Sequence, residues 1–167
     1  DIKSAFLNAQ FGASDVRTYI RLNKQVTMIW LTINPSAEKF VDEKGELILE
    51  LDRFIYGLKQ SPSKFQEHLV VTLLSMGYRQ LSMDECLFIK HTADGFSLIS
   101  CHVDDILQAC TSRLLYTELK TGLTSVYGTI TATDKADEYL GMGIERSECG
   151  KYFKLTQRGL LIKLEEK

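Results

Sequence analysis

The chain has 167 residues and a mass of 19.0 kDa, and 44% of its residues are hydrophobic while 25% are charged. This composition is typical of a globular domain with a sizeable core, and it excludes a disordered or collagen-like chain. The 20 Lys and Arg residues and 22 Asp and Glu residues give a net charge of -2, so no global basic field indicates nucleic-acid binding.

The cysteines and the apolar runs exclude further classes of protein. Cys86, Cys101, Cys110 and Cys149 form no C-x-x-C pair and have no histidine at zinc-finger spacing, so we expect reduced and mostly packed thiols. No apolar run approaches the roughly 20 residues of a membrane helix, and no signal pattern opens the chain. We therefore expect an intracellular setting and no membrane partner. Because the first residue is Asp, we also expect an internal part of a longer protein.

The first 60 residues favour short strands. We expect these strands over residues 2–6, 19–22, 28–33 and 47–51. A loop is expected over residues 11–15, and Asn34-Pro35 should stop the third strand. With no repeat or linker in the sequence, one continuous domain is predicted.

The most regular pattern in the chain predicts a helix that begins at Ser61-Pro62. A hydroxyl cap followed by proline suits a helix start. An amide at the first helical position has no partner within the helix, so proline loses no hydrogen bond there. Apolar side chains then recur every three or four residues, at Phe65, Leu69, Leu73 and Met76. Gly77 is expected to end the helix.

The rest of the chain alternates apolar runs with turns. Strands are expected over residues 86–89, 96–103, 106–110, 129–133, 139–145 and 152–155. A second helix is expected over residues 112–126, ending at Gly128, a turn over 148–150, and a final helix from Thr156. Antiparallel strands with a few helices predict an α+β fold rather than a doubly wound parallel sheet.

Two adjacent carboxylates, Asp104 and Asp105, lie between two apolar runs. Two anions about 4 Å apart repel by roughly 1 kcal/mol in water and about 4 kcal/mol at a partly buried site. An oxygen-loving divalent cation such as Mg²⁺ offsets that repulsion directly. Asp1 supplies a further carboxylate, as two-metal phosphoryl transfer requires. The alternative is a solvated turn, because Asp favours turns.

Three runs of sequence resemble, in order, the motifs of the reverse transcriptase of copia-type (Pseudoviridae) LTR retrotransposons. They are DIKSAFLN at residues 1–8, LDRFIYGLKQSPSKFQ at residues 51–66 and VDD at residues 103–105. YLGMGIE at residues 139–145 and LTQ at residues 155–157 resemble the family's primer-contacting strand and the sequence after it. The resemblance implies a single domain over residues 1–167. Its fold would be the palm, a ferredoxin- or RRM-like antiparallel sheet with helices on one face, plus part of the fingers.

The same resemblance implies roles for particular residues. It makes Asp1, Asp104 and Asp105 the catalytic ligands of two Mg²⁺ ions, with Mn²⁺ as the alternative, and adds the backbone carbonyl of Ile2. The expected nucleotide contacts are Phe6, Tyr56 and Gly57, where the glycine serves close backbone approach or a positive φ. The expected template and primer contacts are Lys59, Ser61, Pro62, His102, Gly141 and Met142. Instead of contacting the nucleotide, Phe6 could be a core residue. Instead of contacting the template or primer, Lys59 could belong to a solvated face.

The activity implied is RNA-directed DNA polymerisation on an RNA template and a DNA primer with a dNTP. The implied partner is the rest of a Pol polyprotein, including RNase H and integrase, in a cytoplasmic virus-like particle. The N-terminal fingers, thumb and connection would lie outside these residues, so the chain alone is expected to be inactive or nearly so.

Two alternatives to an active polymerase stay open at this point. His102 replaces the family's tyrosine before Val-Asp-Asp, so one alternative is a non-catalytic remnant that binds primer-template weakly. Another is an unrelated ferredoxin-like domain with an incidental Asp-Asp turn, which predicts that Asp1 lies far from Asp104.

Overall fold

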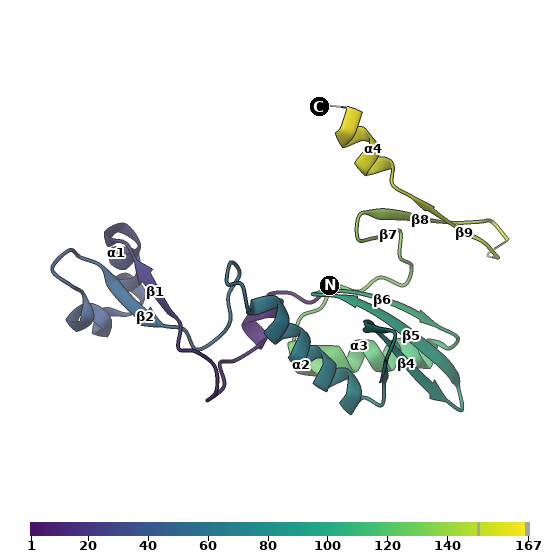
Figure 1. Cartoon of the computed structure of the whole chain (residues 1–167), viewed down its shortest axis with the longest axis horizontal. Coiled ribbons are helices and arrows are strands. Elements are labelled where there is room, and N and C mark those ends of the chain that lie inside the picture. The colour runs from purple at the N-terminus through teal and green to yellow at the C-terminus, as the bar shows by residue number, and fades with distance from the viewer. Residues whose placement is uncertain (150, 166–167) are drawn as a thin grey trace. The chain divides into compact units, whose positions relative to one another are not determined.

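The computed structural model describes residues 1–149 and 151–165, and the chain forms two compact units (Figure 1). The main unit contains Asp1–Ala5 and the chain from Pro62 onward, and the inserted unit contains Phe6–Ser61. Within the described residues, no helix combines the length and apolarity that crossing a membrane requires.

The inserted unit is built on a two-stranded antiparallel hairpin. Its strands are β1 (Tyr19–Leu22) and β2 (Leu47–Glu50), both as predicted. Helix α1 (Lys24–Ile33) and the 3-10 helix η2 (Pro35–Phe40) lie between them in the chain, and the 3-10 helix η1 (Ala5–Asn8) precedes them. Leu47 and Phe54 are the large side chains of this unit that are fully buried, along with Thr27 and Ser61.

Two predicted strands of the first 60 residues are wrong. Residues 28–33 are helical because Asn23 caps α1 by accepting a hydrogen bond of 3.0 Å from the Val26 amide, while the Thr27 hydroxyl donates to the Leu22 carbonyl. The helix ends at Asn34, where a stop was predicted. Residues 2–6 form no strand: Ile2 makes one isolated bridge to Ile130, and η1 follows.

The main unit contains a four-stranded antiparallel sheet in the order β3-β4-β5-β6. The strands are β3 (Arg79–Leu81), β4 (Asp84–Thr92), β5 (Gly95–His102) and β6 (Asp105–Cys110). The last three match the apolar runs predicted as strands, except that β5 ends at His102 and leaves Val103 in the turn. Alternate residues of β5 are buried, so the sheet has one covered face with Ser97, Ile99 and Cys101.

Helices α2 (Ser61–Ser75) and α3 (Arg113–Tyr127) match the two helices predicted before and after these strands (Figure 1). The side chains of Phe65, Leu69 and Leu73 are fully buried, as the periodicity of α2 predicted. Helix α3 packs against β5 and β6. It also contacts α2, because the Tyr127 hydroxyl lies 2.9 Å from His68 Nδ1.

A small three-stranded antiparallel sheet follows α3. It consists of β7 (Glu138–Tyr139), β8 (Met142–Arg146) and β9 (Phe153–Thr156), and α4 (Arg158–Glu165) comes last. The predicted strand over residues 139–145 is broken, because Leu140 and Gly141 form a turn with φ values of 52° and 76°. Residues 129–133 form no strand beyond the bridge at Ile130. The predicted turn over residues 148–150 includes Gly150, which lies outside the described residues.

All four thiols are free, as expected, but their packing differs from the prediction. Cys101 is buried on the covered face of β5, and burial raises the pKa of its thiol to about 12. Cys110 is half-buried. Cys86 and Cys149 are exposed, so the expectation of mostly packed cysteines is wrong for these two. Mixed helix and strand content with antiparallel sheets, the coarse fold prediction, is confirmed.

Candidate functional site

The two adjacent carboxylates lie at the tip of the β5–β6 hairpin. His102 pairs with Asp105 in the strand register, which leaves Val103 and Asp104 as a two-residue turn. Val103 has a φ of 55°, in the left-handed region that β-branched residues rarely adopt. Such strained residues persist where the surrounding structure fixes them, and they are frequent at functional sites. The hairpin therefore presents Asp104 and Asp105 from a fixed, strained turn.

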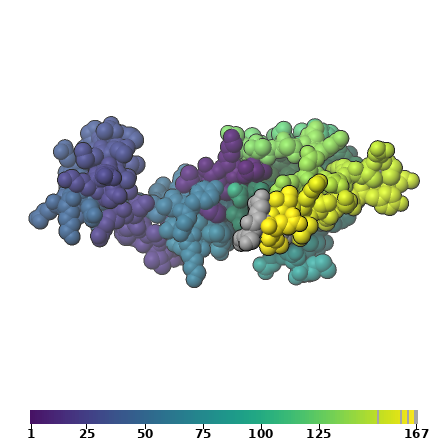
Figure 2. Space-filling view, turned by 90° about the horizontal axis from the view of Figure 1, so that it is seen from above, coloured from purple at the N-terminus to yellow at the C-terminus, as the bar shows by residue number. Residues whose placement is uncertain are grey.

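The first residues of the chain are bound beside this turn. The Ile2 amide donates a hydrogen bond of 3.3 Å to the Asp104 carbonyl, and the Ile2 side chain is only 1% exposed. On the other side, the Thr131 amide donates to the Asp1 carbonyl at 2.9 Å, and the N-terminal amine donates to the Thr131 carbonyl at 3.0 Å. Figure 2 shows the first residues, in purple, next to green residues that follow α3. The prediction of the unrelated-domain hypothesis, that Asp1 lies far from Asp104, is wrong.

The donor chemistry of these residues fits a hard divalent cation. Carboxylates and a backbone carbonyl are the ligands that Mg²⁺ prefers, and Asp1, Ile2, Asp104 and Asp105 supply them from adjoining backbone segments. Their carboxyl groups do not converge in this conformation. Across residues 1–149 and 151–165, no group of three or more His, Cys, Asp or Glu side chains is arranged to hold a metal ion.

An open face of the sheet next to the turn carries further polar groups. His102 and Ser100 are two residues apart on β5, so their side chains share the face opposite the buried Cys101. Asp105, directly across from His102, belongs to the same face. The Tyr139 hydroxyl of β7 lies 3.1 Å from Ser100 Oγ. Burial is the largest cause of the raised pKa of Tyr139, and the charges of Cys101 and then Asp105 add smaller increases, while the hydrogen bond with Ser100 lowers the pKa.

Sequence reasoning missed Ser100 and Tyr139 as a pair. In the sequence, Tyr139 is the first residue of the YLGMGIE run, and no pattern assigns Ser100 a functional role. Nothing local in the sequence indicates a hydrogen bond between residues 39 positions apart.

The predicted nucleotide contacts lie together in the inserted unit. The Phe6 and Tyr56 ring centroids are 4.5 Å apart with an interplanar angle of 50°, and Tyr56 is 57% exposed. Gly57 has a φ of 94°, so its positive φ is confirmed. A Cβ added there would meet nothing within 4 Å, so close backbone approach within the chain does not explain the glycine.

The predicted template and primer contacts differ in exposure. Lys59 and Pro62 are exposed, whereas Ser61 is fully buried and its hydroxyl donates to the Ile55 carbonyl at 2.6 Å. In the main unit, Gly141 lies in the exposed β7–β8 turn and Met142 begins β8. The structure therefore gives Ser61 a local structural contact in addition to any contact with nucleic acid.

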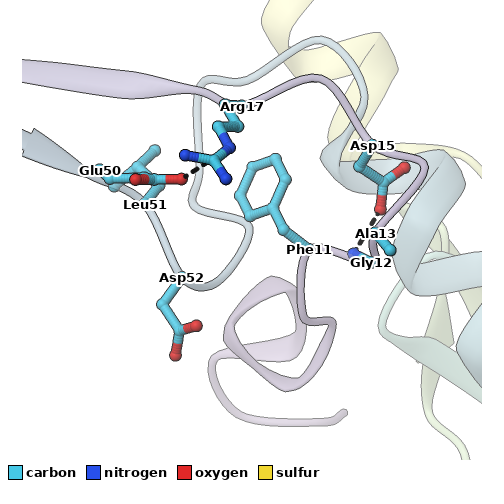
Figure 3. A pocket seen from close by; sticks show the side chains of 8 residues that line it. All are labelled: Phe11, Gly12, Ala13, Asp15, Arg17, Glu50, Leu51 and Asp52. Carbon is cyan, nitrogen blue, oxygen red and sulfur yellow. Dashed lines mark hydrogen bonds and ion pairs between the residues drawn. The ribbon is translucent and has the colours of Figure 1, made fainter.

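Each unit contains a hollow. A groove of about 970 Å³ in the main unit is lined by residues that include Asp1, Ile2, Asp105 and Tyr139. A hollow of about 560 Å³ in the inserted unit contains none of the predicted site residues. Figure 3 shows its Phe11 ring between Arg17, which pairs with Glu50 at 3.6 Å, and Asp15, which accepts from the Gly12 amide. The groove of the main unit is therefore the one associated with the carboxylate turn.

Comparison with known proteins gives consistent matches along the chain. Residues 1–166 match the family model described as "Reverse transcriptase (RNA-dependent DNA polymerase)". The chain is 35% identical over 112 residues to a transposon Ty5-1 protein of Saccharomyces cerevisiae, covering 66% of this chain and 36% of that protein.

Two plant relatives match at lower identity. The Retrovirus-related Pol polyprotein from transposon TNT 1-94 of Nicotiana tabacum is 25% identical over 74% of this chain and 9% of the relative. The Retrovirus-related Pol polyprotein from transposon RE2 of Arabidopsis thaliana is 28% identical over 71% of this chain and 8% of the relative. The chain thus spans about a third or less of the length of these relatives. No solved structure gave a significant match.

Proposed function

The chain belongs to the reverse transcriptase family of copia-type LTR retrotransposons, and on that premise we propose that it is the catalytic core of an RNA-directed DNA polymerase. The proposed reaction is attack of a primer 3′-hydroxyl on the α-phosphate of a dNTP. The new bond joins the primer oxygen to phosphorus, the bond to pyrophosphate breaks, and the hydroxyl proton is lost. The observation that carries the proposal is the 3.3 Å hydrogen bond between Ile2 and Asp104, because it holds Asp1 beside the Asp104-Asp105 turn.

The proposed ligands of the divalent ions are the carboxylates of Asp1, Asp104 and Asp105 together with the Ile2 carbonyl. Mg²⁺ is the proposed ion, with Mn²⁺ as a substitute, and when bound it would neutralise charge at the reacting phosphate. The strained Val103 turn supports this role, since it fixes two of the three carboxylates at the hairpin tip.

We assign the main unit to the palm and the inserted unit to part of the fingers. The antiparallel β3–β6 sheet with α2 and α3 supports the first assignment. The departure of the chain after Ala5 and its return at Pro62 support the second.

The proposed nucleotide contacts are Phe6, Tyr56 and Gly57. Template and primer contacts are proposed for Lys59, Ser61, Pro62, His102, Gly141 and Met142. The proposed partners are RNA template, DNA primer and the rest of the Pol polyprotein, in a cytoplasmic particle.

The experiment compares two single-charge changes in a longer Pol protein that includes this chain. Asp104→Asn keeps the size of the side chain and removes its charge at the proposed metal site. Primer extension on an RNA template with Mg²⁺ should fall by about a hundredfold or more, because a bound metal stabilises the transition state by several kcal/mol. Binding of Mn²⁺ to the protein, followed by electron paramagnetic resonance, should weaken in parallel.

Asp94→Asn is the matched control. Asp94 is an exposed residue in the turn at the opposite end of β5, so its change should leave extension and Mn²⁺ binding as in the wild type. Extension by Asp104→Asn at the wild-type rate would show that the proposed site is wrong. No metal-dependent incorporation by the wild-type longer protein would instead favour the non-catalytic remnant.

A further inference from the structure

The side chain of Tyr139 connects two parts of the main unit that are far apart in sequence. Its hydroxyl lies 3.1 Å from Ser100 Oγ and donates to the Ser100 carbonyl at 3.2 Å. Tyr139 is the last residue of β7, directly before the Leu140-Gly141 turn, and Ser100 belongs to β5 of the large sheet. One phenol therefore joins the β7–β8 hairpin to the strand that leads into the carboxylate turn.

The place of Ser100 in the sheet makes this connection relevant to the carboxylates. Ser100 and His102 share one face of β5, and their cross-strand partners on β6 are Leu107 and Asp105. The Asp105 charge is one of the smaller causes of the raised pKa of Tyr139, after burial and the Cys101 charge. Tyr139 and Asp105 also line the same groove. The phenol thus lies on the open face that carries one of the proposed metal ligands.

Among the residues that the structure describes, the β7–β8 hairpin pairs with β9 and contacts α4. Strand β7 has only two residues, and Tyr139 pairs with Met142 across a turn in which Leu140 and Gly141 both have positive φ. Strand β7 pairs with β8 alone, since the order of this sheet is β7-β8-β9. The hydrogen bonds that the half-buried Tyr139 makes with Ser100, one donated to its carbonyl and one shared with its hydroxyl, are therefore a substantial part of what orients this turn.

We propose that Tyr139 is a positioning residue, which holds the Leu140-Gly141 turn at a fixed place relative to the Asp104-Asp105 turn through Ser100. The inference rests on the proposed polymerase function, in which Gly141 and Met142 contact the primer. Through this anchor, the protein sets the position of the primer end relative to the carboxylates. Tyr139 itself touches neither the nucleotide nor the metal.

The first test uses the chain alone and does not depend on catalysis. Tyr139→Phe keeps the ring and removes both hydrogen bonds. Hydrogen exchange of the Met142 amide, in the residue paired with Tyr139, and of the Ile144 amide, which donates to the Asp137 carbonyl, should accelerate about two- to tenfold, the range expected for the net contribution of a hydrogen bond. Tyr152→Phe is the matched control, because Tyr152 is 71% exposed and its change should leave these amides as in the wild type. Unchanged exchange in Tyr139→Phe would overturn the anchor.

The second test measures single-turnover incorporation by the longer Pol protein. The burst amplitude counts correctly folded enzyme, whereas the burst rate reports how well the primer end is placed. Tyr139→Phe should lower the rate about two- to tenfold at unchanged amplitude, and Tyr152→Phe should change neither. A lower amplitude at the wild-type rate would mean that Tyr139 only stabilises the fold, and it would overturn the proposal.

A double-mutant cycle assigns the effect to the Ser100 contact. Ser100→Ala removes the hydroxyl partner of the Tyr139 phenol and leaves the Ser100 carbonyl, so its effect on the rate and that of Tyr139→Phe should be less than additive in the double variant. If the effects of the two substitutions on the rate are fully additive, Tyr139 does not act through the Ser100 hydroxyl. If the wild-type longer protein incorporates no nucleotide, the polymerase function and the primer role both fall, whereas the exchange result still decides whether the anchor exists.

Discussion

The Ile2 amide and the Asp104 carbonyl are joined by a hydrogen bond of 3.3 Å, although the two residues belong to the first and the third of the family-like runs of sequence. Two further features hold this segment in place. The Ile2 side chain is buried, and the backbones of Asp1 and Thr131 form two hydrogen bonds, one in each direction. The hydrogen bond between Ile2 and Asp104 brings the first carboxylate of the sequence to the hairpin tip that carries the other two. This single backbone contact is the structural basis of the proposed active site.

The strain at Val103 should lower the free energy of unfolding of the chain. Val103→Gly removes a β-branched side chain at a φ of 55°, and we expect the free energy of unfolding to rise by about 0.5–1 kcal/mol. Val16→Gly changes an exposed valine without positive φ, so it should lower stability by a similar amount through the entropy of the unfolded chain. Urea unfolding measures both. Destabilisation of equal size in the two variants would contradict strain at Val103.

Two glycines with open surroundings should respond to alanine with opposite signs. A Cβ would meet nothing within 4 Å at either Gly57 or Gly159, but only Gly57 has a positive φ, 94°. Gly57→Ala should therefore lower the free energy of unfolding by about 1 kcal/mol. Gly159→Ala lies in helix α4 and should raise it by up to about 1 kcal/mol, since alanine is the better helix former. Thermal unfolding of the two variants checks the sign of each change, and equal signs would refute this account.

Alkaline pH should destabilise the chain through Cys101. Burial raises the pKa of this thiol from 9.0 to about 12, so the folded state retains a proton that the unfolded state loses first. The stability contributed by the neutral thiol is complete below pH 9 and is lost as the pH rises towards 12. Between pH 9 and 10 the free energy of unfolding should fall by up to about 1.4 kcal/mol per pH unit.

The matched variants for this pH dependence are two alanine substitutions. Cys101→Ala should make the decline between pH 9 and 10 shallower. Cys86→Ala removes an exposed thiol and should retain the wild-type slope. Urea unfolding at several pH values gives the slopes, and identical slopes for the two variants would argue against a role of Cys101.

The contact between Phe6 and Tyr56 should matter for the choice of sugar. Phe6 is one of the proposed nucleotide contacts, and we propose that its ring packs under the sugar of the incoming nucleotide and rejects a 2′-hydroxyl. Phe6→Ala in the longer protein should lower the preference for dNTP over rNTP by about tenfold or more. Tyr56→Phe keeps the aromatic pair at 4.5 Å and should retain the preference. Incorporation kinetics with a dNTP and an rNTP measure this preference. An unchanged preference in Phe6→Ala would show that Phe6 does not reject the 2′-hydroxyl.

Local sequence signals predicted part of the fold correctly. The Ser61-Pro62 start and the buried repeat of Phe65, Leu69 and Leu73 were sufficient for α2, because capping and periodicity act within a few turns. Residues 28–33 were predicted as a strand from their β-branched and aromatic content. The Asn23 cap and the contact of Thr27 with Leu22 make them helical, and the cap was the signal that the sequence already contained.

The sequence by itself determined the family, the order of its motifs and the identity of the three carboxylates, since these depend only on residue type and spacing. The tertiary structure decided which of these residues lie together. Ile2 reaches Asp104 and Tyr139 reaches Ser100 through hydrogen bonds between segments far apart in the chain. Such contacts form only when the sheet and the helices bury their apolar faces together, so no local pattern specifies them.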